Sequence, residues 1–200
     1  VMMNYCKSQG MICDSIWQSL GGTTGMITAS VDEGRTILCY SGHGSESSWS
    51  SVPFNQTDVQ NLTNPEKYPF VLSHACLTGR FNVSVSYGET WAKTTGKAGM
   101  AFWGASNYTY WDEDDILEKR MFQAAFAETC LSIGSITDKA LWYLYQYYGG
   151  EGFSRYYLDV YNVMGDPSVD LWTQISDTMN AAFPPTINLD TSEVTFTLRN

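Results

Sequence analysis

The chain has 200 residues, of which 44% are hydrophobic, so it can bury a core and is not expected to be disordered. Its formal charge of −10 argues against binding to nucleic acid or to an anionic membrane, which both require clustered cations. The acidity suits basic peptides or divalent cations as ligands, and it also suits a chain that is acidic only to stay in solution.

The first part of the chain predicts short helices and one buried strand. A helix is expected over residues 1–9, and the Gly/Thr-rich stretch 21–25 is expected to form a loop. Residues 35–41 (RTILCYS) form a compact apolar run before a glycine, which is typical of a buried strand. The spacing of Thr57 and Gln60 fits a capping box that opens another short helix.

The middle of the chain continues the alternation of strands and helices. Ser86 and Glu89 form a second capping-box pattern, which predicts a helix to about residue 95. Two further apolar runs predict buried strands, and two helical patterns follow them. The strands are expected over 68–75 and 98–105, and the helices over 115–130 and 135–148.

The last part of the chain indicates a domain boundary. Residues 161–172 contain MGDPSVDLW and predict a turn and a final strand. The composition then changes, and the proline pair at 184–185 is typical of a linker. Residues 192–199 alternate as a half-exposed strand should. We therefore expect one domain over 1–175, and a linker with the first strand of a second domain over 176–200.

Strands that alternate with helices predict an α/β fold with a mostly parallel sheet. In such sheets, ligands bind beyond the carboxyl ends of the strands. The first predicted strand ends just before His43, the second ends just before Cys76, and the third ends near Ser106. The topology therefore brings a histidine, a cysteine and an aromatic, acidic loop to one edge of the sheet.

A cysteine and a histidine at one sheet edge suit nucleophilic catalysis. A thiolate is a strong nucleophile, and a nearby imidazole can generate and stabilise it. We predict Cys76 as the nucleophile and His43 as the general acid and base, with the N–H groups of Gly44 and Cys76 as an oxyanion hole. His74 is the rival base, since it shares a strand face with Cys76, but we favour His43 because its flanking glycines allow it to move. We assign His74 to the wall of the site.

The remaining cysteines carry less information. The chain has five cysteines, no CxxC pair and only two histidines, which argues against a zinc site. Cys39 lies in an apolar run and is expected to be an inert core thiol. Cys6 and Cys13 are candidates for a disulfide, although their spacing does not establish one.

Two motifs resemble a known family. YSGHGSESSW, which contains His43, and SHACLTGRFN, which contains Cys76, resemble the catalytic motifs of the gingipain family of cysteine peptidases. MGDPSVDLW also resembles the strand near the end of that family's catalytic domain. The resemblance implies a caspase-like three-layer αβα sandwich, followed by an immunoglobulin-like β-sandwich.

The resemblance also implies a substrate pocket. Trp111 is similar to the tryptophan that lines the primary specificity pocket, and Asp114 is similar to the pocket carboxylate of the lysine-specific branch. An aromatic wall and a carboxylate suit a Lys or Arg side chain. The alternative is that Asp114 and its acidic neighbours only stabilise the start of a helix. No acidic residue here matches the family's acid that orients the catalytic histidine, which precedes that histidine in the family.

We therefore expect a secreted or surface-exposed bacterial cysteine endopeptidase that acts after Lys or Arg. The alternatives are a sorting peptidase or transpeptidase of the same family, and a binding or adhesin module that kept the fold. The chemistry requires no cofactor; acidic loops and the resemblance suggest a structural calcium ion with unknown ligands. The expected partners are a protein or peptide substrate and another chain of the same processed precursor.

Overall fold

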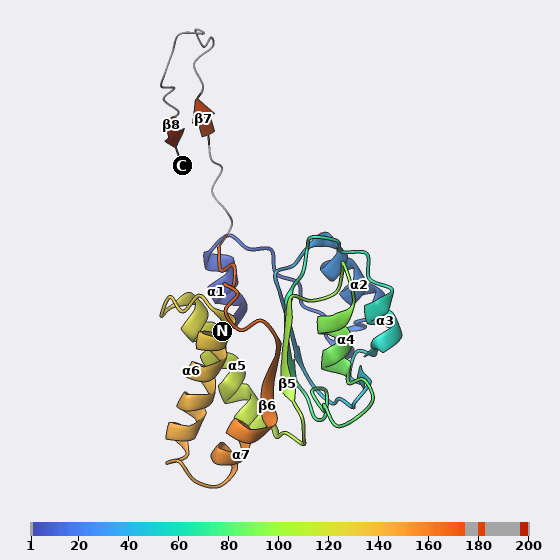
Figure 1. Ribbon diagram of the computed structural model, residues 1–200, viewed down its shortest axis with the longest axis vertical. Coiled ribbons are helices and arrows are strands. Elements are labelled where there is room, and N and C mark those ends of the chain that lie inside the picture. The colour runs from blue at the N-terminus through green and yellow to red at the C-terminus, as the bar shows by residue number, and fades with distance from the viewer. Residues whose placement is uncertain (1, 175–179, 183–196, 200) are drawn as a thin grey trace.

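The computed structural model describes residues 2–174, 180–182 and 197–199. Its centre is a four-stranded sheet in the order β1-β4-β5-β6 (Figure 1). The first three of these strands are parallel, and β6 pairs with β5 in the antiparallel direction. The strands are β1 (Ile37–Ser41), β4 (Phe70–His74), β5 (Ala101–Ala105) and β6 (Tyr161–Gly165).

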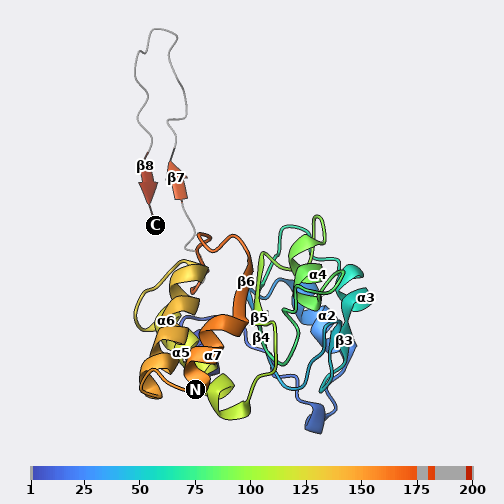
Figure 2. The same ribbon diagram turned by 60° about the horizontal axis from the view of Figure 1, so that its bottom comes forward.

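Helices cover both faces of the sheet, and the two views agree on this arrangement (Figures 1 and 2). One layer contains α1 (Met2–Ser8), α5 (Trp111–Phe126), α6 (Ile133–Tyr147) and α7 (Phe153–Val160). The other layer contains α2 (Thr24–Glu33), α3 (Gln56–Gln60) and α4 (Tyr87–Lys93). Shorter elements are η1 (Gln18–Leu20) and the antiparallel pair β2 (Ser48–Trp49) and β3 (Phe54–Asn55). The described helices and strands form the predicted three-layer αβα sandwich.

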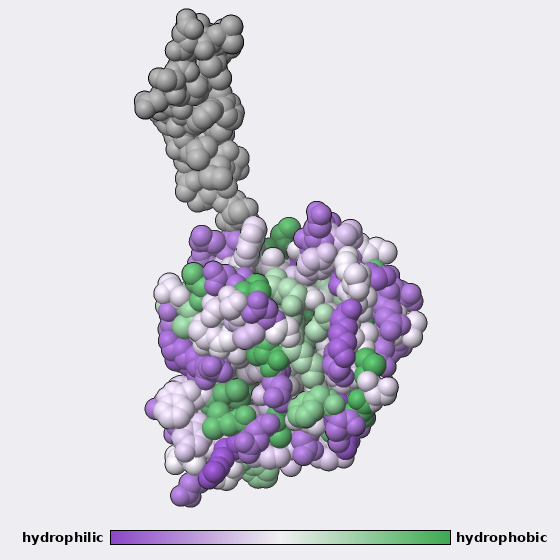
Figure 3. Space-filling model, viewed as in Figure 1, coloured by the Kyte–Doolittle hydropathy of each residue, from purple (hydrophilic) through white to green (hydrophobic). Residues whose placement is uncertain are grey.

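The central strands are buried on both faces because their side chains alternate between two cores. In β4, Phe70 and Leu72 join the core beneath α5 and α6, whereas Val71 joins the core beneath α2 and α4. All five residues of β4 and of β5 are buried, which explains why β5 is a continuous apolar run in the sequence, whereas β4 ends in the buried polar residues Ser73 and His74. At the β6 end of the sheet, Figure 3 shows apolar residues gathered between two more hydrophilic helical layers.

The strands predicted over 35–41, 68–75 and 98–105 and most of the predicted helices are confirmed, with corrections at their ends. Within 161–172, the strand is Tyr161–Gly165, so it precedes the predicted turn instead of following it. The capping box of α3 involves Asn55 and Asp58 rather than Thr57 and Gln60, because the Asn55 side chain accepts hydrogen bonds from the first turn. Helix α5 begins at Trp111, four residues earlier than predicted. Helices α2 and α7 were not predicted, and residues 24–25, expected in a loop, form the first turn of α2.

The end of the chain is described only in part. Strand β7 (Asn180–Ala182) pairs with β8 (Thr197–Arg199) in the antiparallel direction, and β7 lies within the segment predicted as a linker. β8 is the end of the strand predicted over 192–199, whose other residues lie outside the described residues. The predicted immunoglobulin-like domain also falls largely on residues outside the described ones, and it stays a prediction.

A buried hydrogen-bonded chain connects β4 to the segments that follow β1 and β4. The indole Nε1 of Trp49 donates to the Ser73 hydroxyl over 2.9 Å, and Ser73 shares a 2.9 Å hydrogen bond with the Thr78 hydroxyl. Thr78 in turn donates to the Ala75 carbonyl over 3.2 Å. Because buried polar groups are costly unless they are paired, this chain fixes the two segments to β4.

We predict that Ser73→Ala lowers the free energy of unfolding by about 1–3 kcal/mol, because it leaves the Trp49 N–H buried without an acceptor. Urea unfolding, followed by circular dichroism, measures this difference. Ser50→Ala is the matched control, since Ser50 is exposed and its hydroxyl forms no hydrogen bond within the described residues. Equal stabilities of the two variants would show that the buried chain contributes nothing.

Candidate active site

The parallel register brings His43 and Cys76 to the same edge of the sheet. Ser41, the last residue of β1, pairs with His74, the last residue of β4, and the pairing is extended by a hydrogen bond from the Gly42 N–H to the His74 carbonyl. His43 and Cys76 therefore both lie two residues beyond this last strand pair. This edge, where β5 also ends, is the lower one in Figure 1.

Two hydrogen bonds fix the backbone carbonyl of His43, whereas its side chain is exposed. The Tyr40 hydroxyl donates to the His43 carbonyl over 2.7 Å, and the Ser50 N–H donates to the same oxygen over 2.9 Å. The Tyr40 ring stacks on Trp49 with 4.4 Å between ring centroids. A fixed backbone beneath an exposed imidazole suits a residue that transfers protons to and from a bound ligand.

Cys76 lies in a sharp turn after β4. The next residue, Leu77, has a φ of 64°, a left-handed conformation that is strained for a side chain of this size. A 3.1 Å hydrogen bond from the Leu77 N–H to the Asn107 carbonyl holds this turn against the loop after β5. The Thr109 N–H, from the same loop, donates to the Cys76 sulfur over 3.3 Å, and the Cys76 thiol lies 3.7 Å from the Thr109 carbonyl oxygen.

Gly44 brings the two segments into direct contact. A Cβ atom at position 44 would lie 2.7 Å from the Thr78 side chain, 2.9 Å from the Ala75 Cβ and 3.1 Å from the Cys76 carbonyl oxygen, so a larger residue does not fit. Within the described residues, the N–H groups of Gly44 and Cys76 donate no hydrogen bond. The oxyanion hole formed by these two N–H groups stays a prediction.

A salt bridge also joins the two segments at the surface. Arg80, which follows Cys76, donates to the Glu46 carboxylate, which follows His43, over 2.8 Å. The Glu46 carbonyl accepts a 2.7 Å hydrogen bond from the Tyr87 N–H at the start of α4. No Asp or Glu within the described residues forms a salt bridge with His43, so nothing here supplies the orienting acid.

The two predicted pocket residues lie on the first turn of α5. Trp111 is 60% exposed, and its ring lies edge-on to the His43 imidazole with 5.7 Å between centroids. Asp114 is buried, and its Oδ1 accepts a 2.6 Å hydrogen bond from the Tyr161 hydroxyl. No Lys, Arg or His within the described residues pairs with Asp114. Burial without a neutralising cation raises the pKa of Asp114 to about 6.

His74 lies beneath the site rather than at its surface. Its side chain is only 1% exposed, and its ring packs edge-on against Trp103. The ring Nδ1 lies 3.4 Å from the Tyr161 hydroxyl, and burial lowers the pKa of His74 to about 3. A neutral, enclosed imidazole is a poor competitor for the role of His43, and a contact between His74 and substrate stays a prediction.

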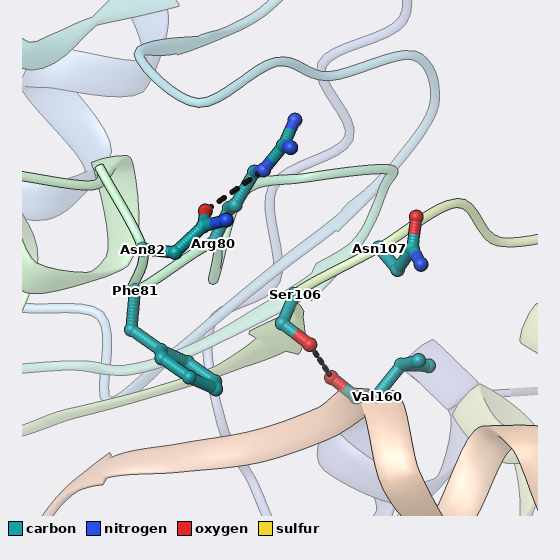
Figure 4. Close-up of a pocket in the computed structure, with 6 residues that line it drawn as sticks. All are labelled: Arg80, Phe81, Asn82, Ser106, Asn107 and Val160. Atoms are coloured by element: carbon teal, nitrogen blue, oxygen red, sulfur yellow. Dashed lines mark hydrogen bonds between the residues drawn. The ribbon is translucent and has the colours of Figure 1, made fainter.

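A pocket of about 220 Å³ lies beside the predicted dyad, between the segment that follows Cys76 and the end of β5 (Figure 4). Its lining contains neither Cys76 nor His43. In the close-up, the Ser106 hydroxyl donates to the Val160 carbonyl, and Arg80 donates to the Asn82 side chain. The pocket is lined by Arg80, Phe81, Asn82, Ser106, Asn107 and Val160.

Sequence reasoning did not identify Thr109 and Tyr161, which contact the predicted site residues. The loop after β5 was recognised as aromatic and acidic, but no pattern marks Thr109 as the residue that reaches Cys76. Tyr161 lies 47 residues from Asp114 in the sequence, so no local spacing could have linked the two. Only the antiparallel pairing of β6 with β5 places Tyr161 beside this site.

We predict that Asp114 makes the chain less stable as the pH rises. Its folded pKa of about 6 lies above the ordinary value of 3.8, so its contribution is complete below about pH 3.8 and is lost as the pH rises through 6. Between about pH 4 and pH 7.5, the chain should lose about 2–3 kcal/mol relative to Asp114→Asn, as measured by urea unfolding. Asp112→Asn, an exposed position on the same turn, should keep the pH dependence of the unchanged chain. If the free energy of unfolding depends on pH in the same way in all three proteins, the raised pKa of Asp114 is contradicted.

The comparisons with known proteins agree with this geometry. Residues 8–172 match the family model described as Peptidase family C25. Gingipain R1 of Porphyromonas gingivalis is 27% identical over 183 residues, which are 87% of this chain and 18% of that protein. Lys-gingipain of the same species is 36% identical over 76 residues, which are 38% of this chain and 4% of that protein. This chain thus spans less than a fifth of either relative.

A solved structure confirms the fold. The crystal structure of the Arg-specific cysteine proteinase gingipain R matches all of this chain and 48% of that chain, with a TM-score of 0.78 and 22% identity. At this identity, the likeness shows the fold alone, and it confirms the caspase-like architecture implied by the sequence motifs. The family match covers most of the chain, so the chain belongs to peptidase family C25.

Proposed function

We propose that this chain carries the catalytic dyad of a cysteine endopeptidase, with Cys76 as nucleophile and His43 as general acid and base. One observation carries the proposal. The parallel strands β1 and β4 are followed by two segments that contact each other, one with the exposed imidazole of His43 and one with Cys76, whose sulfur accepts a backbone N–H. Membership of peptidase family C25 supports the same chemistry.

In the proposed reaction, the Cys76 sulfur attacks the carbonyl carbon of the peptide bond. The N–H groups of Gly44 and Cys76 stabilise the negative charge that develops on the carbonyl oxygen. His43 donates a proton to the leaving amine, and a thioester remains on Cys76. His43 then takes a proton from water, which attacks the thioester and releases the carboxylic acid and the free cysteine.

For the substrate, we propose a Lys or Arg residue before the cleaved bond. The buried Asp114 has hydroxyl partners but no cation of its own within the described residues, so a substrate cation would supply the missing charge. Trp111 is exposed beside His43 and can pack against the aliphatic part of such a side chain.

Export from the cell is part of the proposal and rests on the family resemblance alone. None of the described helices is long and apolar enough to cross a membrane. A structural calcium ion and a partner chain from the same precursor also stay proposals, and neither is needed for the thioester chemistry.

We predict that a peptidyl electrophile labels Cys76 covalently and that labelling requires both members of the dyad. Mass spectrometry of the labelled chain measures the site and the rate. Cys76→Ala should abolish labelling, and His43→Ala should slow it by about 100-fold or more, because general acid–base catalysis contributes about 10²–10⁴-fold. Cys130→Ser is the matched control, because Cys130 contacts Lys139 away from the sheet edge. Labelling at another cysteine, or none with any probe in the presence of calcium, would instead favour a binding module.

We predict that probes ending in Lys or Arg react faster than probes ending in Asn or Asp. Asp114→Asn should slow the Lys and Arg probes by about 100-fold, because it removes a buried charge that pairs with the substrate cation. Asn and Asp probes should be unaffected by the same change. A preference for Asn or Asp in the unchanged chain would remove the role of Asp114 but would leave the dyad in place.

A further inference from the structure

A second cluster of reactive side chains lies under the sheet edge, apart from the predicted dyad. It consists of Cys39 on β1, His74 on β4 and Glu118 on α5. One sulfur, one ring nitrogen and one carboxylate oxygen from these residues lie within 4.8 Å of one another. The Cys39 sulfur and the Glu118 Oε1 are already 3.3 Å apart. None of these residues has a role in the proposed thioester chemistry.

The fold brings these three groups together from distant parts of the chain. Cys39 pairs with Leu72 in the parallel register, so His74 is its diagonal neighbour on the same face of the sheet. Helix α5 packs on that face and directs Glu118, which is buried, toward the two strands. The separation of 79 residues between Cys39 and Glu118 explains why no ligand spacing is visible in the sequence.

Hydrogen bonding leaves one nitrogen of His74 available to this cluster. The Tyr161 hydroxyl donates its hydrogen to Asp114, so its oxygen is an acceptor for the His74 Nδ1–H at 3.4 Å. That tautomer leaves the Nε2 lone pair without a hydrogen. Nε2 is buried and has no hydrogen-bond partner within the described residues. An unpaired buried polar atom is rare and requires an explanation.

We propose that Cys39, His74 and Glu118 bind a single zinc ion, with the His74 Nε2 as the nitrogen ligand. Thiolate and imidazole are ligands that Zn²⁺ prefers, whereas Ca²⁺ takes oxygen atoms only. A thiolate and a carboxylate together neutralise the charge of the ion, which suits a buried site. Three protein ligands and one water complete a tetrahedral set.

The geometry requires only a small contraction. Ligand bonds of about 2.0–2.3 Å place the ligand atoms of a tetrahedral zinc site about 3.5 Å apart. Atoms that now lie up to 4.8 Å apart therefore approach by at most about 1.3 Å, which side-chain rotations can supply, and the Cys39 and Glu118 atoms at 3.3 Å need no approach. The chain from His74 through Tyr161 to Asp114 supplies the outer hydrogen bonds that usually orient a histidine ligand.

The bound ion would join three elements beneath the active site. It would connect the ends of β1 and β4 to helix α5, which carries Trp111 and Asp114 on its first turn. We infer a structural role for the ion, since His74 and Glu118 are buried and none of the three ligands belongs to the predicted dyad.

The experiment uses the full chain with Cys76→Ala, because Cys76 and His43 could otherwise bind the same metals. The chain is stripped with a chelator and titrated with Co²⁺, and then with Zn²⁺ in competition. One equivalent of Co²⁺ should produce a thiolate-to-cobalt charge-transfer band in the near ultraviolet, and Zn²⁺ should remove the band and raise the melting temperature. If Co²⁺ produces no such band, or if only Ca²⁺ raises the melting temperature, the proposal is wrong. No variant of Cys39, His74 or Glu118 is needed to obtain this result.

Variants then locate the site. Cys39→Ser should abolish the charge-transfer band and weaken Zn²⁺ binding by about 100-fold or more. Cys130→Ser, which leaves as many thiols as Cys39→Ser does, should change neither the band nor the affinity for Zn²⁺. Tyr161→Phe should keep the band and weaken binding by about 10-fold, because it leaves all three ligands in place and removes the outer hydrogen bond to His74, together with the one to Asp114. A band that survives Cys39→Ser at full strength would place the metal elsewhere and contradict the proposal.

Discussion

The parallel pairing of β1, β4 and β5 is the constraint on which the site depends. Parallel strands end at the same edge of a sheet, so each connection after a strand begins beside its neighbours. The hydrogen bond from Gly42 to His74 extends this register one step beyond the strands. His43 and Cys76 therefore follow one strand pair at equal distance, although 33 residues separate them.

The two faces of β4 support the edge in different ways. On the face toward α2 and α4, Ser73 forms a hydroxyl chain with Trp49 and Thr78, and this chain holds the segments of His43 and Cys76. On the opposite face, His74 lies in a cluster with acidic and thiol groups beneath α5. Alternation of side chains along a strand separates these two environments by a single residue. Cys76 thus follows a strand whose last two residues, Ser73 and His74, are buried and polar.

Desolvation decides the properties of the acidic residues on α5. Asp112 and Asp114 are both on the first turn of the helix, where the helix dipole favours negative charge. Asp112 is exposed and makes a surface contribution, whereas Asp114 is enclosed with Tyr161 and its pKa rises to about 6. The helix-start interpretation therefore suits the exposed Asp112, whereas the role of pocket carboxylate stays a proposal for the buried Asp114.

The sequence by itself determined the strands β1, β4 and β5, the α/β class, and the placement of His43 and Cys76 at strand ends. Those features depend on local hydrophobic patterns and on a topological rule, which a single chain displays directly. Helix α7, the direction of β6 and the approach of Tyr161 and Glu118 to the sheet were decided only by tertiary structure. They depend on packing between residues that are 47 to 79 positions apart, and no local spacing records such contacts.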